Sequence, residues 1–257
     1  MRTLYFDCFS GSSGDMLLGA LVDLGLDPAV LRSAVEALGL GDVRLDVARV
    51  ERAALAAAKV AVVVGGLVEG PHGAVHRHGD HDHDHDHHHE HGPSRGMGEI
   101  LEVIALAGLS DLTKERASRI FARLAEAEAR AHGTTPEEVH FHEVGAVDAI
   151  VDVVGACAGV EALGVERFVS SPLNVGGGTV TFSHGTYPVP GPATAELVRG
   201  VPVYSGAVKR ELLTPTGAAV ITTLAGEYGP LPELVDLHLD DARAAIHRTC
   251  PFAPPTT

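Results

Sequence analysis

Histidine is concentrated in one short stretch of the chain. Half of the twenty residues from position 72 to 91 are histidine, and five of the others are carboxylates. Neutral imidazole is a good ligand for nickel, zinc and copper, while carboxylates add charge and hydrogen-bond acceptors around such ions. The composition predicts a reservoir for divalent transition metal without choosing among these three, although a solvated linker is the alternative interpretation. The predicted ligands are His72, His76, His78, His81, His83, His85, His87, His88, His89 and His91.

A second group of candidate ligands follows position 139. In an extended segment, His140 and His142 point to the same side. Asp148 and Asp152 are four positions apart, so they share one face of a helix. They stand among Ala, Ile and Val, where an unpaired charge is costly. With Glu143, these residues predict a zinc, nickel or manganese shell, and the alternative is an amphipathic helix with solvated acids.

The N-terminal segment D-C-F-S-G-S-S-G-D-M predicts a strand, a Gly/Ser turn and a helix start. Backbone N–H groups and hydroxyls in such a turn can bind phosphate, although no Walker A lysine is present. Asp7 and Asp15 flank the turn and are candidate ligands for a divalent ion, with Asp15 as a helix cap in the alternative interpretation. Cys8 is either a reactive thiolate or a small buried residue. The predicted phosphate-binding residues are Ser10, Gly11, Ser12, Ser13 and Gly14.

Two later segments also carry candidate binding groups. Gly176, Gly177 and Gly178 permit close approach of a ligand to the backbone. His184 lies in a Gly-flanked loop and is a candidate base, although a loop histidine is more often structural. Thr214 and Thr216 offer two hydroxyls at a predicted helix start, where they suit either an anion or simple capping.

The pattern of apolar residues predicts the elements that position these groups. Strands and helices are mixed without a regular βαβ rhythm, which predicts an α+β (irregular α/β) fold with a mixed sheet, packed helices and a long disordered His-rich insertion at 66–96. Predicted strands are 3–7, 42–49, 60–64, 167–175, 179–182 and 201–204, with 140–143 extended. Predicted helices are 15–25, 29–38, 98–106, 112–131, 146–163, 193–199 and 216–224.

The composition narrows the possible partners and compartment. The net charge is −15, and an acidic surface repels nucleic acid. The most apolar long segment, 146–165, contains three acids, so no membrane span is expected. Three widely spaced cysteines and the lack of a signal peptide favour a reducing, cytoplasmic location.

Four segments together resemble one family, the nickel-insertion proteins of nickel-pincer nucleotide cofactor biosynthesis (LarC family). They are F-D-C-F-S-G-S-S-G-D-M, H-F-H-E-V-G-A-V-D-A-I-V-D-V-V-G, the P-L-N-V-G-G-G-T-V segment with H-G-T-Y-P-V-P-G-P-A-T, and E-L-L-T-P-T-G-A-A. The resemblance covers residues 1–230 as one domain and leaves 231–257 as an irregular, Pro-containing tail.

The resemblance implies insertion of nickel into pyridinium-3,5-bisthiocarboxylic acid mononucleotide, coupled to hydrolysis of CTP with Mn²⁺ or Mg²⁺. The product is the cofactor of lactate racemase and related enzymes. Family members usually continue into a second domain to which nucleotide binding is attributed, so a separate C-terminal-half chain, a homo-oligomer or both are expected partners. Forming a nickel–carbon bond removes a ring proton, for which Glu143 or His184 is the candidate base. A nickel storage protein or metallochaperone and a metal-dependent hydrolase are the alternative functions.

Overall fold

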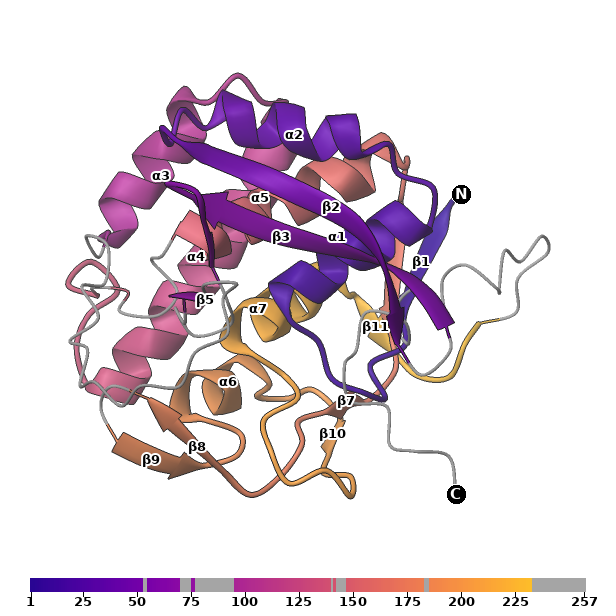
Figure 1. The fold of residues 1–257 in the computed structure, drawn as a ribbon. Coiled ribbons are helices and arrows are strands. Elements are labelled where there is room, and N and C mark those ends of the chain that lie inside the picture. The colour runs from indigo at the N-terminus through magenta and orange to yellow at the C-terminus, as the bar shows by residue number, and fades with distance from the viewer. Residues whose placement is uncertain are drawn as a thin grey trace, which may run out of the picture.

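A computed structural model describes residues 1–52, 55–69, 75–76, 95–139, 141, 147–182 and 185–232. The helices lie mainly on one side of the long antiparallel strands, and the small C-terminal strands gather at the opposite end from α2 (Figure 1). None of the helices in these ranges is long and apolar enough to cross a bilayer.

The site described below lies at one edge of a small parallel sheet. This sheet contains β1 (Thr3–Phe6), β6 (Arg167–Ser170) and β11 (Glu227–Tyr228), with β6 in the middle. Thr3 pairs with Arg167 and Phe6 with Ser170, while Tyr228 reaches Ser170 from the other side. Three of the four residues in both β1 and β6 are buried, as expected for parallel strands covered on both faces. The carboxyl ends of these strands therefore meet at one edge.

Helices α1 (Gly14–Asp23), α4 (Asp111–His132), α5 (Val147–Ala162) and α7 (Pro215–Leu224) form most of the core, and α5 packs against the other three. Leucine side chains pack very close to Gly155 and Gly159 of α5. A Cβ atom on Gly159 would lie 2.8 Å from Leu21, and one on Gly155 would lie 3.0 Å from Leu18. The missing side chains let α1 approach α5 closely, which fixes the start of α1 relative to α5.

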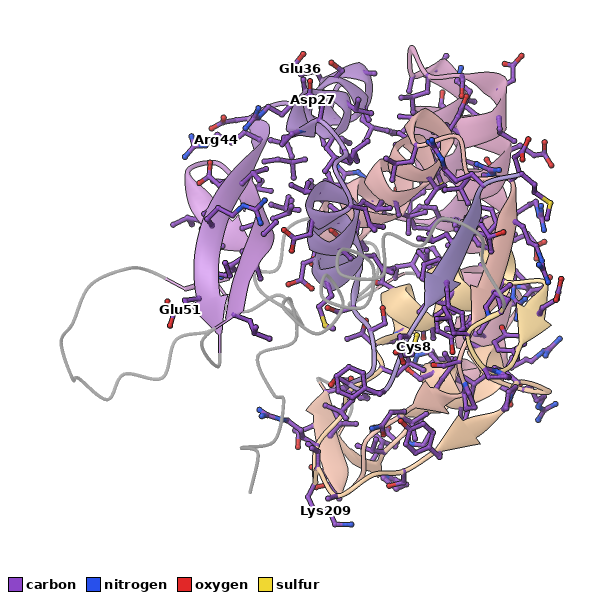
Figure 2. All side chains as sticks on the ribbon, turned by 90° about the vertical axis from the view of Figure 1, so that its right-hand side faces the viewer. Cys8, Asp27, Glu36, Arg44, Glu51 and Lys209 are labelled. Carbon is purple, nitrogen blue, oxygen red and sulfur yellow. The ribbon has the colours of Figure 1, made fainter. Side chains whose placement is uncertain are left out.

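An antiparallel sheet covers α1 and α2 (Pro28–Ala37). Its strands, in spatial order, are β2 (Val43–Arg52), β3 (Leu55–Val64), β4 (Leu67–Glu69) and β5 (Val75–His76). Strands β2 and β3 pair over their full length, from Val43 with Val64 to Arg52 with Leu55. Arg44 and Glu51 point outward from this ribbon (Figure 2). Helix α3 (Met97–Leu106) follows and packs on α4.

The C-terminal third adds short elements around the parallel sheet. Strand β7 (Leu173–Asn174) pairs in parallel with β10 (Val203–Tyr204). Between them in sequence lie the hairpin of β8 (Thr179–Phe182) and β9 (Gly185–Pro188) and then helix α6 (Pro192–Leu197), which packs on α4 and α7.

The α+β class predicted from the sequence is confirmed, and most helix positions agree within two residues. Within the described ranges, however, parallel and antiparallel strands occupy separate sheets rather than one mixed sheet. The strand expected at 167–175 is two strands, because β6 pairs with β1 and β7 turns away to β10. The insertion expected from residue 66 contains β4 and β5, which extend the antiparallel sheet. The rest of the insertion predicted to be disordered is mainly residues 70–74 and 77–94, and most of the predicted irregular tail is residues 233–257. These residues lie outside the described part, so both remain predictions.

Candidate functional site

The Gly/Ser turn after β1 is bound to the segment that follows β6. The backbone N–H of Cys8 donates to the hydroxyl of Ser171 at 2.9 Å, and that of Asn174 donates to the Cys8 carbonyl at 3.2 Å. The side-chain amide of Asn174 also donates to the Phe9 carbonyl at 2.6 Å. Two predicted motifs that are more than 160 positions apart in sequence therefore form adjoining walls.

A third wall comes from the segment just before α7. The Ser12 N–H donates to the Leu212 carbonyl at 2.9 Å, and the Thr214 N–H donates back to Ser12 at 3.0 Å. On the other side, Leu212 donates to Val175 at 3.2 Å and Gly177 donates to Arg210 at 3.1 Å. Segment 210–214 thus lies between the turn and the glycine run, and all three predicted loop motifs meet.

Glycine is needed here because backbones cross at short range. Gly11 has a φ of +79°, and a Cβ atom on it would lie 2.0 Å from the Leu212 carbonyl oxygen. Gly176 has a φ of +85°, and its Cβ would lie 1.9 Å from the Arg210 carbonyl oxygen. No L side chain fits either position. The close approach that the sequence suggested for a ligand is made by the protein's own backbone.

Several of the predicted phosphate-binding N–H groups already have partners. Gly11 donates to Cys8 at 3.0 Å, and Gly176 donates to the Asn174 side chain at 3.1 Å, in addition to the Ser12 and Gly177 bonds given above. A phosphate held by this site must therefore use other groups. The binding role of Ser10 to Gly14 and of Gly176 to Gly178 remains a prediction.

The acidic pair on α5 lies beside the Gly/Ser turn. A Cβ atom on Gly14 would lie 2.1 Å from an oxygen of Asp152, so the carboxylate is pressed against the first residue of α1. The Asp152 side chain belongs to a residue only 8% exposed. Asp148, in the first turn of α5, is half-buried and accepts a hydrogen bond from the Ala149 N–H at 2.8 Å. One candidate metal ligand on α5, Asp152, is thus an immediate neighbour of the candidate phosphate-binding turn.

The predicted metal shell is incomplete within the described ranges. No three His, Cys, Asp or Glu side chains there are grouped to hold an ion. His140, His142 and Glu143 lie outside the described residues, as do the candidate base His184 and the tract histidines, except that His76 is placed by its main chain in β5. The shell that joins Asp148 and Asp152 to His140 and His142 therefore remains a prediction.

Asp7 and Asp15 lie at the two ends of the turn and have different neighbours. Asp15 accepts a hydrogen bond from the Ser13 hydroxyl, and Ser13 does not cap α1 with its side chain. Asp7 lies near Tyr204, which is 41% exposed. Partial burial, followed by the negative charge of Asp7, raises the pKa of Tyr204. Tyr204 is therefore a neutral hydroxyl at neutral pH, and it donates to the Phe9 carbonyl at 3.4 Å.

Cys8 is the buried alternative of the two interpretations. Its residue is 1% exposed, and it lies in the interior at the end of β1 (Figure 2). Burial raises the pKa of the Cys8 thiol to about 12, which a weak contact with the Ser170 hydroxyl only partly opposes. The thiol remains protonated at neutral pH and is a poor nucleophile.

Thr214 is the N-cap of α7. Its side-chain oxygen accepts from the Gly217 N–H at 3.2 Å, which confirms the predicted helix start. Thr216 lies in the first turn and is half-buried. An additional anion-binding role for these two hydroxyls remains a prediction.

Asn174 organises the site, although sequence reasoning did not select it. Its side chain donates to Phe9 and accepts from Gly176 and, at 3.3 Å, from Gly206. One amide therefore joins the turn, the glycine run and the loop after β10. An asparagine two positions before the first of three glycines was the available signal, because an amide can both donate and accept where chains cross.

Comparison with known proteins decides which family these motifs represent. Residues 4–239 match the family described as nickel insertion protein. The chain belongs to the nickel insertion protein family.

Several relatives of this nickel insertion protein carry the same description in more detail. A protein of Desulfitobacterium hafniense (strain DSM 10664 / DCB-2) is 44% identical over 234 residues, covering 91% of this chain and 52% of the relative. One from Thermotoga sp. (strain RQ2) is 48% identical over 229 residues, covering 89% and 54%. Both are named pyridinium-3,5-bisthiocarboxylic acid mononucleotide nickel insertion protein. A protein of Syntrophobacter fumaroxidans, 42% identical over 235 residues, with 91% of this chain and 54% of the relative covered, is named a putative nickel insertion protein.

The chain spans about half the length of the curated relatives it matches. No solved structure matches it. All the motifs discussed above fall inside the matched residues of the nickel insertion family, including the Gly/Ser turn, α5 and segment 210–214.

Proposed function

We propose that this chain holds Ni²⁺ next to pyridinium-3,5-bisthiocarboxylic acid mononucleotide and is the nickel-handling part of an insertase. Membership of the nickel insertion family supports nickel as the metal, and the names of the relatives support this substrate. The observation that carries the proposal is the contact between Asp152 and Gly14, which puts one candidate metal ligand beside the candidate phosphate-binding turn. Insertion requires both reactants to be held together at short range.

In this proposal the substrate occupies the edge of the parallel sheet. Ligands of α/β sheets commonly bind outside the carboxyl ends of parallel strands, where the loops diverge. The walls are the Ser10–Gly14 turn, the Gly176–Gly178 run and segment 210–214, which leads into α7. The hydroxyls of Ser10, Ser12, Ser13, Thr214 and Thr216 are the proposed phosphate contacts. Ser13 donates its hydroxyl proton to Asp15 and would exchange that bond for one to the phosphate.

Nickel enters as a substrate from the histidine tract at 72–91. It then binds His140, His142, Asp148 and Asp152, with Asp7 and Asp15, at the two ends of the turn, as further candidates. Formation of the nickel–carbon bond breaks a ring C–H bond and leaves a proton. Glu143 or His184 is the proposed acceptor, because a carboxylate and an imidazole can both act as general bases.

We further propose that CTP, with Mn²⁺ or Mg²⁺, acts through a different part of the assembly. The Gly/Ser turn has no Walker A lysine, and several of its main-chain N–H groups are already bonded within the protein, which supports a triphosphate site elsewhere. A C-terminal half, as a separate chain or within a homo-oligomer, is the proposed CTP-binding partner. We propose that the complete reaction takes place in the cytoplasm.

A nickel storage protein or metallochaperone is the second candidate, and the density of histidine at 72–91 favours it. Storage needs the tract alone and leaves the three-walled site unexplained. A metal-dependent hydrolase would use the α5 acids but would be indifferent to loss of the tract.

The test is formation of a product that activates lactate racemase, with the complementary C-terminal half present. His142→Ala is expected to abolish activation while most bulk nickel binding survives, and Asp148→Asn is expected to reduce activation strongly. Asp46→Asn, an exposed acid on β2 that removes the same charge, is the matched control and is expected to match wild type. If His142→Ala and Asp148→Asn both activate the racemase as well as wild type does, the assigned nickel site is wrong.

A further inference from the structure

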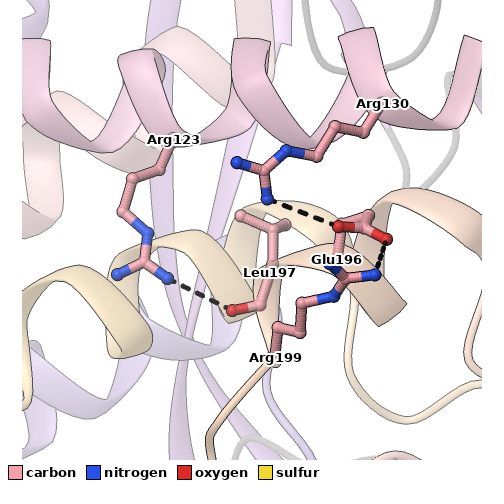
Figure 3. Close-up of polar contacts among 5 residues, drawn as sticks. All are labelled: Arg123, Arg130, Glu196, Leu197 and Arg199. Carbon is pink, nitrogen blue, oxygen red and sulfur yellow. Dashed lines mark hydrogen bonds and ion pairs between the residues drawn. The ribbon is translucent and has the colours of Figure 1, made fainter. Parts of the chain in front are cut away.

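A polar pocket between α4 and α6 lies apart from the loops of the candidate site. It has a volume of about 270 Å³ and is lined by Arg123, Glu126, Ala127, Arg130, Glu196 and Leu197. Ligand pockets for small molecules start at about 300 Å³, so a cavity of this size suits a small ligand or one group of a larger one. Arg199 stands beside it and points to Glu196 (Figure 3).

Arginine is concentrated here in a protein that is acidic as a whole. The chain has 19 basic residues and 34 acidic ones, yet three arginines meet two glutamates around this pocket. The surface elsewhere disfavours anions, whereas this pocket presents an excess of positive charge. The guanidinium group also matches the geometry of phosphate oxygens through paired N–H donors.

Arg123 is fixed in place without being neutralised. Its guanidinium donates to the Thr222 carbonyl at 2.9 Å and to the Leu197 carbonyl at 3.3 Å (Figure 3). These two bonds hold it between the ends of α6 and α7, but a carbonyl carries only a partial charge. Arg123 therefore supplies an ordered positive charge to the wall of the pocket.

Glu196 is shared between two arginines. Its carboxylate lies 3.0 Å from Arg199 and 3.5 Å from Arg130, which is long for a charge-assisted hydrogen bond. One negative charge therefore serves two positive ones, and the Arg130 side chain is 57% exposed. Arg130 can turn toward an incoming anion at small cost because exposed ion pairs of this kind are weak.

We propose that this pocket binds a small phosphate-bearing anion, with Arg130 and Arg123 as the principal contacts and Glu196 as a competitor for Arg130. The ligand is either free inorganic phosphate or the phosphate of a mononucleotide. The site is independent of the proposed insertase function, since none of its residues belongs to the three walls described above.

Calorimetric titration of the full chain with inorganic phosphate, at an ionic strength held constant with chloride, tests the proposal. Wild type is expected to bind phosphate saturably, and Arg130→Gln to bind about fivefold more weakly or worse, because a charged hydrogen bond is lost. Arg119→Gln removes the same charge from an exposed position of the same helix outside the pocket and is expected to match wild type. Arg199→Gln is a second variant. It is expected to fold normally because Arg199 is exposed and lies outside α6.

Glu196→Gln separates binding from a structural role. If the glutamate competes with the ligand, its neutralisation tightens phosphate binding, whereas a purely structural ion pair predicts weaker or unchanged binding. Parallel titrations with CMP identify the source: tighter binding than phosphate, with the same dependence on Arg130, indicates a nucleotide. The proposal is overturned if wild type shows no saturable phosphate binding in the chloride buffer, or if Arg130→Gln binds as tightly as wild type. It is also overturned if Glu196→Gln binds phosphate no more tightly than wild type.

Discussion

Two glycines with nearly the same backbone conformation differ in their surroundings. Gly11 has a φ of +79° and Gly41 a φ of +83°. A Cβ atom on Gly11 would meet the Leu212 carbonyl oxygen at 2.0 Å, while one on Gly41 would meet nothing within 4 Å. The pair isolates the effect of backbone crossing from that of a left-handed conformation.

We predict that Gly41→Ala lowers the free energy of unfolding by about 1–2 kcal/mol, the cost of a left-handed non-glycine residue. Gly11→Ala is expected to cost about 1–3 kcal/mol more, because overpacking is added to the same strain. Urea unfolding measures both values. Equal destabilisation by the two substitutions would show that the Leu212 segment moves away freely and that the walls of the site are not tightly joined.

The residue types of the site were readable from the sequence, but their immediate neighbours were not. Gly11 and Gly176 were assigned to ligand approach, and the structure shows that each faces a carbonyl of the protein itself. A glycine signals that something comes close without saying what it is. The contact of Asp152 with Gly14 was likewise out of reach, because it depends on how α1 packs on α5.

At the scale of elements, α7 depends on one side chain for its start. The Thr214 hydroxyl oxygen accepts from the Gly217 N–H, and the next residue is proline, which suits the first helical position. The backbone N–H of Thr214 also donates to the Ser12 carbonyl. The cap therefore holds α7 in register with the Gly/Ser turn.

We predict that Thr214→Ala lowers the free energy of unfolding by about 1 kcal/mol, the usual cost of removing such a cap. Thr214→Ser retains the hydroxyl and is expected to remain close to wild type. Chemical denaturation followed by circular dichroism provides the comparison. A Thr214→Ala protein as stable as wild type would mean that the hydroxyl is not committed to the helix.

Long elements were predictable, whereas several short strands were not. Helix α4 was expected at 112–131 and spans Asp111–His132, because its apolar residues recur with helical spacing over many turns. Strands β4, β5, β9 and β11 were missed. Strand β11 has only two residues, Glu227 and Tyr228, and it is a strand because β6 offers it a partner. Such pairing is set by tertiary context rather than by local preference.

At the scale of the whole molecule, we propose separate functions for the histidine tract and the three-walled site. We predict that the purified protein binds several Ni²⁺ ions per chain and fewer below pH 6. Histidine has a pKa of about 6.5, so lowering the pH protonates the ring and removes the lone pair that binds metal. Calorimetric titration with nickel at pH 5.5 and 7.5 measures the difference.

The matched variant replaces residues 72–91 with a Gly/Ser linker of the same length, which preserves the distance spanned by the chain. It is expected to lose most of its nickel stoichiometry. Its insertion activity should fail only when nickel is scarce. Unchanged stoichiometry in this variant would show that the tract is not the reservoir, and unchanged activity at limiting nickel would argue against transfer from the tract to the site.

The distance in sequence between the walls of the site sets the order in which they can form. Cys8 and Ser171 are separated by 163 positions, and Leu212 is further along still. When the histidine tract of a growing chain leaves the ribosome, two of the three walls have therefore not yet been synthesised. Closing so long a loop is also entropically costly, which makes the joining of β1 to β6 a late step. If the tract is the nickel reservoir proposed above, a nascent chain binds nickel before its insertion site has formed.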